Sequence, residues 1–348
     1  MTWLERNLIG FVHFVVTPIN HDQTNPVKPN PAKLDPVKLD PVKLDPVKPN
    51  MPEAVSSIEI AQQHAALPPD SAHSGDARSE PGELITLRTL RRMARQGQPF
   101  AALTCYDATF ARLLERAGVH VLLVGDTAAE VVLGFHRTID MPLEISLALT
   151  AAVKRGAPNT VVMGDMPFMS YQLDINEAVR NAGRFLTDGH ADIVKLEVDS
   201  SFKLTVAAMA RAGIPVCAHI GSLPQRAAIA GGYGSAGRTR ADAAKIVDDA
   251  VAMEEAGAAM LLIEAVPDEV TKAVMHTTKL PLIGIGAGPN PHGQVLVLHD
   301  LLGLTPKAPR FADPVAMLGL AVENAGREWV KRVLSRNVGG QHYTMREE

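Results

Sequence analysis

The sequence has no excess of positive charge. Of its 348 residues, 34 are lysine or arginine and 38 are aspartate or glutamate, so the formal net charge is -4. Proteins that bind nucleic acid through its phosphates usually carry a basic patch or stripe. The sequence shows no such stripe, and we expect no nucleic-acid partner.

Cysteine is also scarce, because the chain contains only Cys105 and Cys217. Both lie within or beside short apolar stretches, and their number and spacing fit neither a disulfide framework nor a zinc site. We expect both to be reduced side chains packed in the interior of a cytoplasmic protein.

The amino-terminal region lacks an apolar run long enough to cross a membrane. Its apolar stretch, residues 8–18, falls well short of the roughly twenty residues that a spanning helix needs. No small-residue cleavage motif follows it, as a secretory signal would require. We therefore expect no membrane partner and a cytoplasmic location.

Proline recurs in a five-residue repeat between residues 25 and 50, typified by Asp-Pro-Val-Lys-Leu. Proline at this spacing blocks both helix and sheet, and the composition offers little to bury. We predict that residues 1–82 form a disordered extension, although a binding role for the repeat stays open. Residues 83–348 are predicted to form the catalytic domain, and 46% hydrophobic content is enough for one large core.

Short apolar runs alternate with amphipathic segments throughout this predicted domain. Continuous apolar runs are typical of strands buried on both faces of a parallel sheet. The expected strands are 100–104, 119–125, 160–164, 192–197, 214–219, 258–264 and 281–286. The expected helices are 107–117, 145–155, 176–188, 201–212, 240–256 and 267–277.

Acidic residues stand at the carboxyl ends of several expected strands: Asp126, Asp165, Glu197 and Glu264. An open sheet would gather its ligands at one crevice, whereas a (β/α)8 barrel, or TIM barrel, brings all strand ends to one face. We therefore predict a (β/α)8 barrel with its active site there. The alternative for any single acid is that it only caps the following helix.

Asp126 and Asp165 would form a hard oxygen site suited to Mg²⁺, which Glu197 could join directly or through a water molecule. Lys195 precedes Glu197 by two residues, so both side chains should point into the barrel. There Lys195 would hold an anionic substrate, unless it serves only a buried ion pair.

Glu264 lies on a strand well separated from the two aspartates. Desolvation could raise its pKa and make it a general base. His219 could donate a hydrogen bond to a substrate oxygen, although it could equally be a core histidine with no role in the reaction.

From about residue 85 to at least residue 305, the chain resembles the ketopantoate hydroxymethyltransferase family. The order and spacing of several segments carry the resemblance: Leu103-Thr-Cys-Tyr-Asp107, Leu123-Val-Gly-Asp-Thr127, Val153-Lys-Arg-Gly-Ala157, Asp165-Met-Pro-Phe-Met-Ser-Tyr171, Val194-Lys-Leu-Glu197, Gly231-Gly-Tyr233, Glu264-Ala-Val-Pro267, Gly284-Ile-Gly-Ala-Gly288 and Gly293-Gln-Val-Leu-Val-Leu-His-Asp300.

The resemblance implies a barrel of the phosphoenolpyruvate/pyruvate superfamily type and a homodecamer. It also implies transfer of a one-carbon unit from 5,10-methylenetetrahydrofolate to 3-methyl-2-oxobutanoate, giving 2-dehydropantoate for pantothenate biosynthesis. The implied roles are a Mg²⁺ site at Asp126, Asp165 and Glu197, a 2-oxoacid site at Asp126, Thr127, Asp165 and Lys195, and a proton acceptor at Glu264.

The sequence departs from the family pattern at Thr127, Ala148-Leu149, Ser222-Leu223, Ala236 and His292. Two alternatives to the family reaction therefore stay open. One is a diverged paralogue acting as a Mg²⁺-dependent aldolase or lyase on another 2-oxoacid. The other is a catalytically inactive barrel kept for assembly or regulation.

Overall fold

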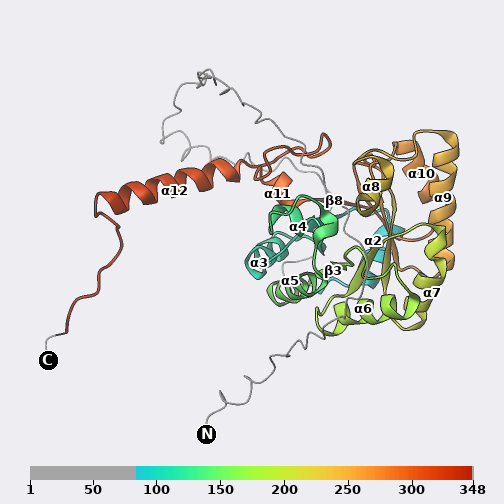
Figure 1. Cartoon of the computed structure of the whole chain (residues 1–348), viewed down its shortest axis with the longest axis horizontal. Helices are drawn as coiled ribbons and strands as arrows, with labels where there is room; N and C mark the ends of the chain where they lie inside the picture. Colours follow the sequence, from blue (N-terminus) through green and yellow to red (C-terminus); the bar gives the residue numbers. More distant parts are fainter. Residues whose placement is uncertain (1–83, 347–348) are drawn as a thin grey trace, which may run out of the picture. The chain divides into compact units, whose positions relative to one another are not determined.

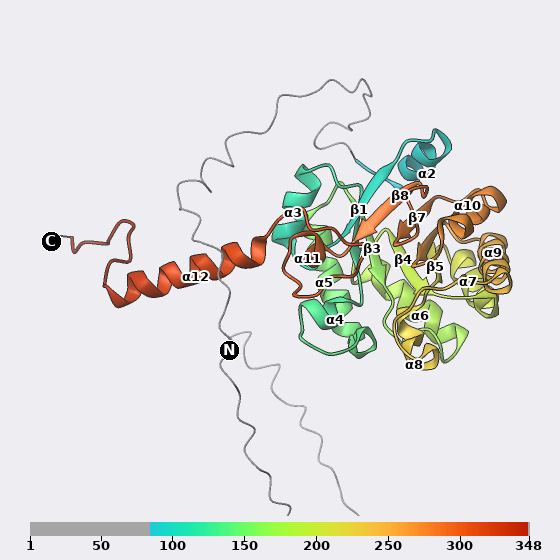
Figure 2. The same ribbon diagram turned by 90° about the horizontal axis from the view of Figure 1, so that it is seen from above.

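The computed structural model describes residues 84–346, so the predicted extension, residues 1–82, lies outside the described residues. The described chain forms a closed barrel in which each strand pairs in parallel with the next and the last pairs with the first (Figures 1 and 2). Its strands are β1 (Phe100–Thr104), β2 (Val121–Val124), β3 (Val161–Asp165), β4 (Ile193–Glu197), β5 (Val216–Gly221), β6 (Met260–Glu264), β7 (Leu282–Ile285) and β8 (Gly293–Leu296).

Helices surround this barrel, as a (β/α)8 fold requires (Figure 2). The α-helices are α2 (Leu87–Arg95), α3 (Ala108–Arg116), α4 (Ala128–Val131), α5 (Leu143–Gly156), α6 (Ile175–Thr187), α7 (Lys203–Arg211), α8 (Ala227–Ala230), α9 (Arg240–Glu255), α10 (Asp268–Thr277), α11 (Leu298–Leu301) and α12 (Leu318–Leu334). Short 3₁₀ turns occur at η2 (Thr138–Asp140), η3 (Ser200–Phe202) and η4 (Pro224–Arg226). The predicted barrel is thus confirmed.

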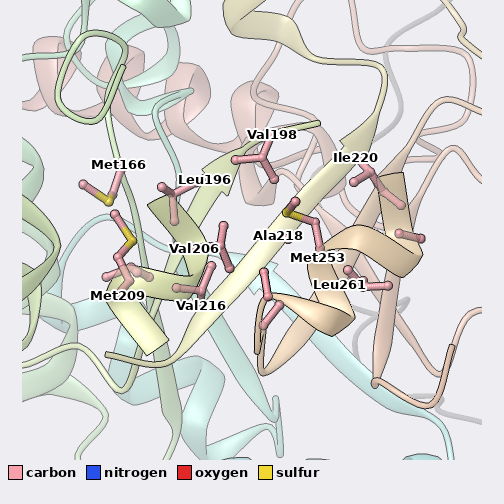
Figure 3. Close-up of a cluster of buried hydrophobic side chains, with 14 of the residues drawn as sticks. Met166, Leu196, Val198, Val206, Met209, Val216, Ala218, Ile220, Met253 and Leu261 are labelled. Carbon is pink, nitrogen blue, oxygen red and sulfur yellow. The ribbon is translucent and has the colours of Figure 1, made fainter. Parts of the chain in front are cut away.

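The strands have two apolar layers because successive side chains point to opposite faces. Phe100, Val121, Leu123 and Met163 belong to the layer inside the barrel. The other layer lies between strands and helices, where Leu196, Val216, Ala218, Ile220 and Leu261 pack with Val206, Met209 and Met253 (Figure 3). Strands β2 to β7 therefore have no exposed residue, which explains their continuous apolar runs, whereas Ala101 of β1 and Gln294 of β8 are exposed.

Glycine stands two residues after the end of α3, α6 and α9, and two of these three glycines have the left-handed backbone that favours this residue. Gly118 has φ +81° and Gly257 has φ +89°. After α6, however, His190 adopts the left-handed conformation, with φ +55°. A side chain at the preceding Gly189 would approach the Phe185 carbonyl oxygen to 2.7 Å, so glycine is needed there for close packing.

Both cysteines are buried and unpaired, as expected for packing residues. Burial raises the pKa of the Cys105 thiol to about 11 and that of Cys217 to about 12. Within residues 84–346, no helix combines the length and the apolar character needed to cross a membrane.

Candidate active site

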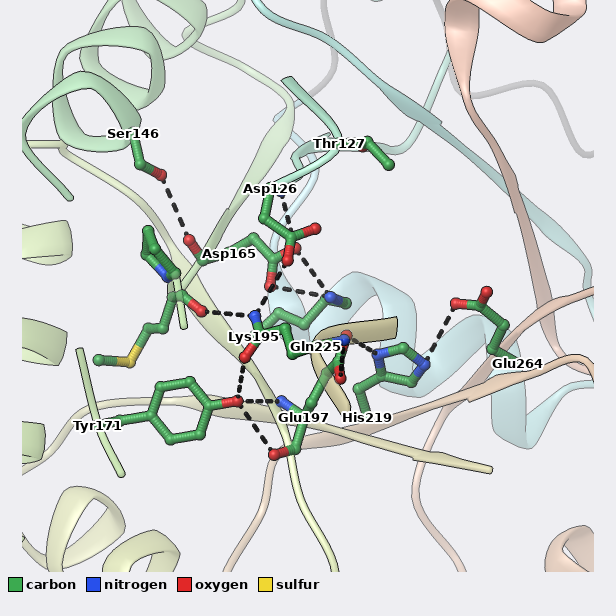
Figure 4. Close-up of polar contacts among 12 residues, drawn as sticks. Asp126, Thr127, Ser146, Asp165, Tyr171, Lys195, Glu197, His219, Gln225 and Glu264 are labelled. Carbon is green, nitrogen blue, oxygen red and sulfur yellow. Dashed lines mark hydrogen bonds and ion pairs between the residues drawn. The ribbon is translucent and has the colours of Figure 1, made fainter. Parts of the chain in front are cut away.

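A cavity of about 590 Å³ opens at the carboxyl ends of the strands. It is lined by the strand-end residues that the sequence singled out: Asp126 and Thr127 after β2, Asp165 on β3, Lys195 and Glu197 on β4, His219 on β5 and Glu264 on β6 (Figure 4). The structure therefore brings all seven predicted site residues to one cavity.

Strand register explains why these side chains meet. Asp165 pairs with Lys195, Glu197 pairs with His219, and Gly221 pairs with Glu264. Each of these strands also contributes apolar residues to the inner layer, at positions two or four residues before its polar end. The polar groups are therefore the uppermost part of the barrel interior.

Lys195 and Asp165 form a buried ion pair. The lysine Nζ donates to both carboxylate oxygens of Asp165 at 2.8 Å, and the backbone N–H of Asp126 donates to Asp165 Oδ2 at 3.0 Å. Burial raises the pKa of the Asp165 carboxyl to about 7, although Lys195 opposes this shift. Burial lowers the pKa of Lys195, but nearby carboxylates, Asp165 foremost, outweigh it and raise that pKa above its usual range.

Glu197 is the second fully enclosed carboxylate of the site, with 2% of its surface exposed. Burial raises its pKa well above the usual range, and the charges of Asp126 and Asp165 add to this effect, while Lys195 opposes it. Three carboxylates thus share one lysine in a space with little solvent. When all three carboxylates are ionised, their negative charge exceeds the positive charge of the lysine, and a divalent cation would neutralise the excess.

Within residues 84–346, no three His, Cys, Asp or Glu side chains are placed to enclose a metal ion by themselves. This does not conflict with a magnesium site, because Mg²⁺ commonly uses one or two carboxylates and completes its coordination with water and substrate oxygens. The hard oxygen donors at the cavity floor therefore fit this ion.

His219 lies between two carboxylates (Figure 4). Its Nε2 is 3.4 Å from Glu264 Oε2 and its Nδ1 is 3.8 Å from Glu197 Oε1. Both ring nitrogens are buried, and neither has a hydrogen-bond partner among the described residues. Burial, assisted by the charge of Lys195, lowers the pKa of His219, and Glu264 opposes this shift.

Glu264 differs from the other acids in being partly open to the cavity, with 23% of its side chain exposed. Glu264 is therefore less buried than we expected for a general base whose pKa is raised by desolvation. Its position on β6 still separates it from Asp165 on β3, as expected.

Polar residues beyond the strand ends also line the cavity, among them Thr127, Glu130 and Tyr233. Tyr106 and Thr127 share a hydrogen bond of 2.9 Å between their hydroxyl groups. Tyr233 lies beside Glu130, with its hydroxyl donating to the carboxylate at 3.5 Å, and burial raises the pKa of Glu130. Phe311 also lines the cavity. The cavity thus combines the charged strand-end residues with polar and aromatic residues from the loops.

Sequence reasoning missed Gln225, which contacts two of the predicted metal ligands. Its side-chain Nε2 donates to Asp126 Oδ2 at 3.0 Å, and its backbone N–H donates to Glu197 Oε2 at 2.9 Å. In the sequence, an uncharged residue after Pro224 is typical of an ordinary turn. The only signal was its place in the segment that follows strand β5, four residues after the end of that strand.

Most departures from the family pattern lie away from the cavity. Thr127 and Ser222 line it, whereas Ala148, Leu149, Ala236 and His292 do not. His292 accepts a hydrogen bond from the Leu282 backbone at the opposite end of the barrel, where β7 and β8 begin.

Solved structures with the same fold include phosphonopyruvate hydrolase in complex with oxalate and Mg²⁺, with a TM-score of 0.51 and 17% identity over 73% of this chain and 88% of that chain. Phosphoenolpyruvate phosphomutase from Streptomyces platensis has a TM-score of 0.50 and 15% identity over 73% and 89% of the two chains. At these identities the likeness concerns the fold alone, which is the (β/α)8 barrel predicted from the sequence.

Similarity in sequence is much stronger within one family. Residues 84–340 match the family described as ketopantoate hydroxymethyltransferase. The 3-methyl-2-oxobutanoate hydroxymethyltransferase of Hyperthermus butylicus is 42% identical over 74% of this chain and 90% of its own length. The Halorhodospira halophila protein of that name is 39% identical over 78% and 98%. This chain therefore belongs to the ketopantoate hydroxymethyltransferase family.

Proposed function

We propose that this protein transfers a hydroxymethyl group from 5,10-methylenetetrahydrofolate to 3-methyl-2-oxobutanoate, giving 2-dehydropantoate for pantothenate biosynthesis. The observation that carries the proposal is the convergence of Asp126, Asp165, Lys195 and Glu264 on one cavity. The names of the similar proteins from Hyperthermus butylicus and Halorhodospira halophila support the same reaction.

In this proposal, Asp126 and Asp165 hold Mg²⁺, and Glu197 contributes directly or through a water molecule. When bound, Mg²⁺ would supply positive charge that stabilises an enolate oxygen. Lys195, which already lies among carboxylates, would balance the negative charge of the 2-oxoacid, and Thr127 would donate a hydrogen bond to it. These residues thereby fix the orientation of the substrate.

Glu264 acts as the proton acceptor for the C3 proton of 3-methyl-2-oxobutanoate. Its partly open side chain faces the cavity, where a substrate carbon can approach. His219 donates one N–H to a substrate oxygen or to Glu264, since both ring nitrogens lack other partners among the described residues. Water replaces the two folate nitrogens on the methylene carbon, which gives tetrahydrofolate and a one-carbon unit at the oxidation level of formaldehyde. The enolate carbon bonds to that unit, and its oxygen takes up the proton held by Glu264 to become the hydroxyl group.

The test is an assay of the purified protein with 3-methyl-2-oxobutanoate, methylenetetrahydrofolate and Mg²⁺. Formation of 2-dehydropantoate that depends on all three is expected. Exchange of the C3 proton into D₂O without folate would isolate enolate formation. Folate-independent cleavage of another 2-oxoacid would favour the aldolase or lyase alternative, and the absence of both activities would favour an inactive barrel.

We also infer that the protein is a cytoplasmic homo-oligomer, as the resemblance to decameric family members implies. Helix α12 supports self-association, because none of its residues is buried and several are large and apolar, including Leu320, Trp329 and Val333. Light scattering should give a mass several times that of the 37.2 kDa chain. A Trp329→Glu variant should shift that mass toward the monomer.

A further inference from the structure

The side-chain amide of Gln225 has all of its hydrogen-bonding groups occupied. Its Oε1 accepts from the Tyr171 hydroxyl at 2.8 Å and from Gln172 Nε2 at 3.3 Å. Its Nε2 donates to Asp126 Oδ2 at 3.0 Å and to the Met166 carbonyl at 3.1 Å. Only 4% of Gln225 is exposed, so no solvent competes for these groups. The amide therefore has one favoured orientation.

Gln225 also joins two predicted metal ligands that come from different strands. The side chain contacts Asp126, which follows β2, while the backbone N–H contacts Glu197, which ends β4. Both contacts are donated to a carboxylate oxygen, and such charge-assisted hydrogen bonds are among the stronger ones. A single residue in the segment after β5 thus constrains two carboxylates, one just after β2 and one at the end of β4 (Figure 4).

The Asp126 carboxylate and the Met166 carbonyl determine which way the amide faces, because both can only accept a hydrogen bond. The Tyr171 hydroxyl accepts from the backbone N–H of Glu197 at 3.1 Å and has two acceptors within reach, the Glu197 carbonyl at 3.1 Å and the nearer Gln225 Oε1 at 2.8 Å, to which it donates. A rotated amide would place Nε2 against Tyr171 and Oε1 against the Asp126 carboxylate, which would set two acceptors together. The donors thus run in one direction, from the Glu197 backbone through Tyr171 and Gln225 to Asp126.

We propose that Gln225 is a positioning residue that, with Tyr171, fixes the carboxylates of Asp126 and Glu197 and so sets the affinity of the site for a hard divalent cation. This inference rests on the metal site of the proposed function. Residues that orient metal ligands typically contribute about 10–100-fold to metal affinity or activity. Loss of the Gln225 amide would leave Asp126 free to adopt other orientations.

The experiment uses the full chain and Mn²⁺, whose binding is followed by electron paramagnetic resonance of the free ion. Gln225→Met keeps the approximate volume and the backbone N–H but removes the amide. Its Mn²⁺ dissociation constant should rise about 10–100-fold. Gln294→Met is the matched control, because the exposed Gln294 amide donates only to the Gly288 carbonyl outside the predicted metal site. The control should bind Mn²⁺ as the unmodified protein does.

Tyr171→Phe provides an independent variant, since it keeps the buried ring and removes only the hydroxyl. It should weaken Mn²⁺ binding by less than Gln225→Met, and the double variant should bind no more weakly than Gln225→Met alone. That non-additivity is expected because both residues act through one chain of hydrogen bonds. Excess Mn²⁺ should restore C3 proton exchange in Gln225→Met, which a variant with a distorted fold would not show.

Unchanged Mn²⁺ affinity in a folded Gln225→Met variant would overturn the inference. Near-ultraviolet circular dichroism would show whether Gln225→Met folds. If it does not fold, Tyr171→Phe is the deciding variant, and a Mn²⁺ affinity equal to that of the unmodified protein would overturn the inference. An unmodified protein that binds no Mn²⁺ would remove the inference together with the metal site. If the unmodified protein and Gln225→Met bind Mn²⁺ equally well, the inference fails but the proposed function is unaffected.

Discussion

At the scale of single residues, substitution of Glu264 should separate substrate binding from proton transfer. In Glu264→Gln the amide keeps the shape of the side chain but cannot accept the C3 proton, so exchange into D₂O should fall at least about 100-fold. Binding of the 2-oxoacid should remain. NMR of 3-methyl-2-oxobutanoate without folate measures this step.

Glu255→Gln is a suitable control, because Glu255 lies on α9 and pairs with Lys203 at the surface. It should exchange the C3 proton at the rate of the unmodified protein. If Glu264→Gln also did so, the base would have to be reassigned, and His219 at 3.4 Å from Glu264 would be examined next.

The two aspartates at the cavity floor give a second prediction. Asp126→Ala or Asp165→Ala should abolish Mg²⁺-dependent turnover, because each removes a hard ligand from an ion that uses few protein ligands. Asp126→Ala is the simpler variant, since Asp165→Ala also leaves Lys195 without its ion pair. Calorimetric titration with Mg²⁺ measures the loss.

The exposed Asp313→Ala serves as a control for the aspartate variants. It should leave Mg²⁺ binding unaltered. Normal Mg²⁺ affinity in both Asp126→Ala and Asp165→Ala would refute the assignment of these two residues to the metal.

At the scale of secondary-structure elements, Gly164 controls how closely β3 and α6 pack. A β-carbon at Gly164 would collide with the buried ring of Phe185. Gly164→Ala should therefore lower the free energy of unfolding by about 1–3 kcal/mol, and it should also reduce activity because Asp165 is the next residue. Denaturant unfolding measures the first effect.

Gly183 on α6 is the matched control, since a β-carbon there meets no atom within 4 Å. Gly183→Ala should raise the free energy of unfolding by about 0.5–1 kcal/mol, because alanine loses less backbone entropy in a helix. Equal effects of the two substitutions would show that the Gly164 contact with Phe185 does not limit packing.

The strands differ in how well the sequence predicts them. Those that are buried on both faces have apolar runs that mark them clearly, as in β2 and β6. The prediction included eight strands but located only seven, because β8 has four residues that begin with glycine and glutamine, and its Gln294 is exposed. The predicted helix 201–212 also starts with the 3₁₀ turn η3 before α7.

The residues of the candidate active site also differ in how well the sequence predicts them. A charge at the end of an apolar strand has no use in packing, so Asp126, Asp165, Lys195, Glu197 and Glu264 could be selected from the sequence alone. Gln225 and Tyr171 could not be selected, because their contacts with Asp126 and with the backbone of Glu197 come from loops that only the closed barrel brings together.

At the scale of the whole molecule, we predict that the residues before about position 80 are not needed for activity. Their proline-repeat composition offers few side chains that could pack against a barrel. A protein that starts at Gly82 should keep the kcat and KM of the full chain, measured in the hydroxymethyl transfer assay. An insoluble or inactive truncated protein would place the domain boundary elsewhere.

The pairing of β1 with β8 also affects how the chain is made. Phe100 of the first strand lies beside Gly293 of the last, so the ribosome must synthesise nearly the whole barrel before the seam can close. Until then the nascent chain carries an unpaired strand edge on β1, and such edges can associate with other chains. The final seam depends on the short strand β8, so substitutions there would affect folding yield in the cell more than the chemistry of the finished enzyme.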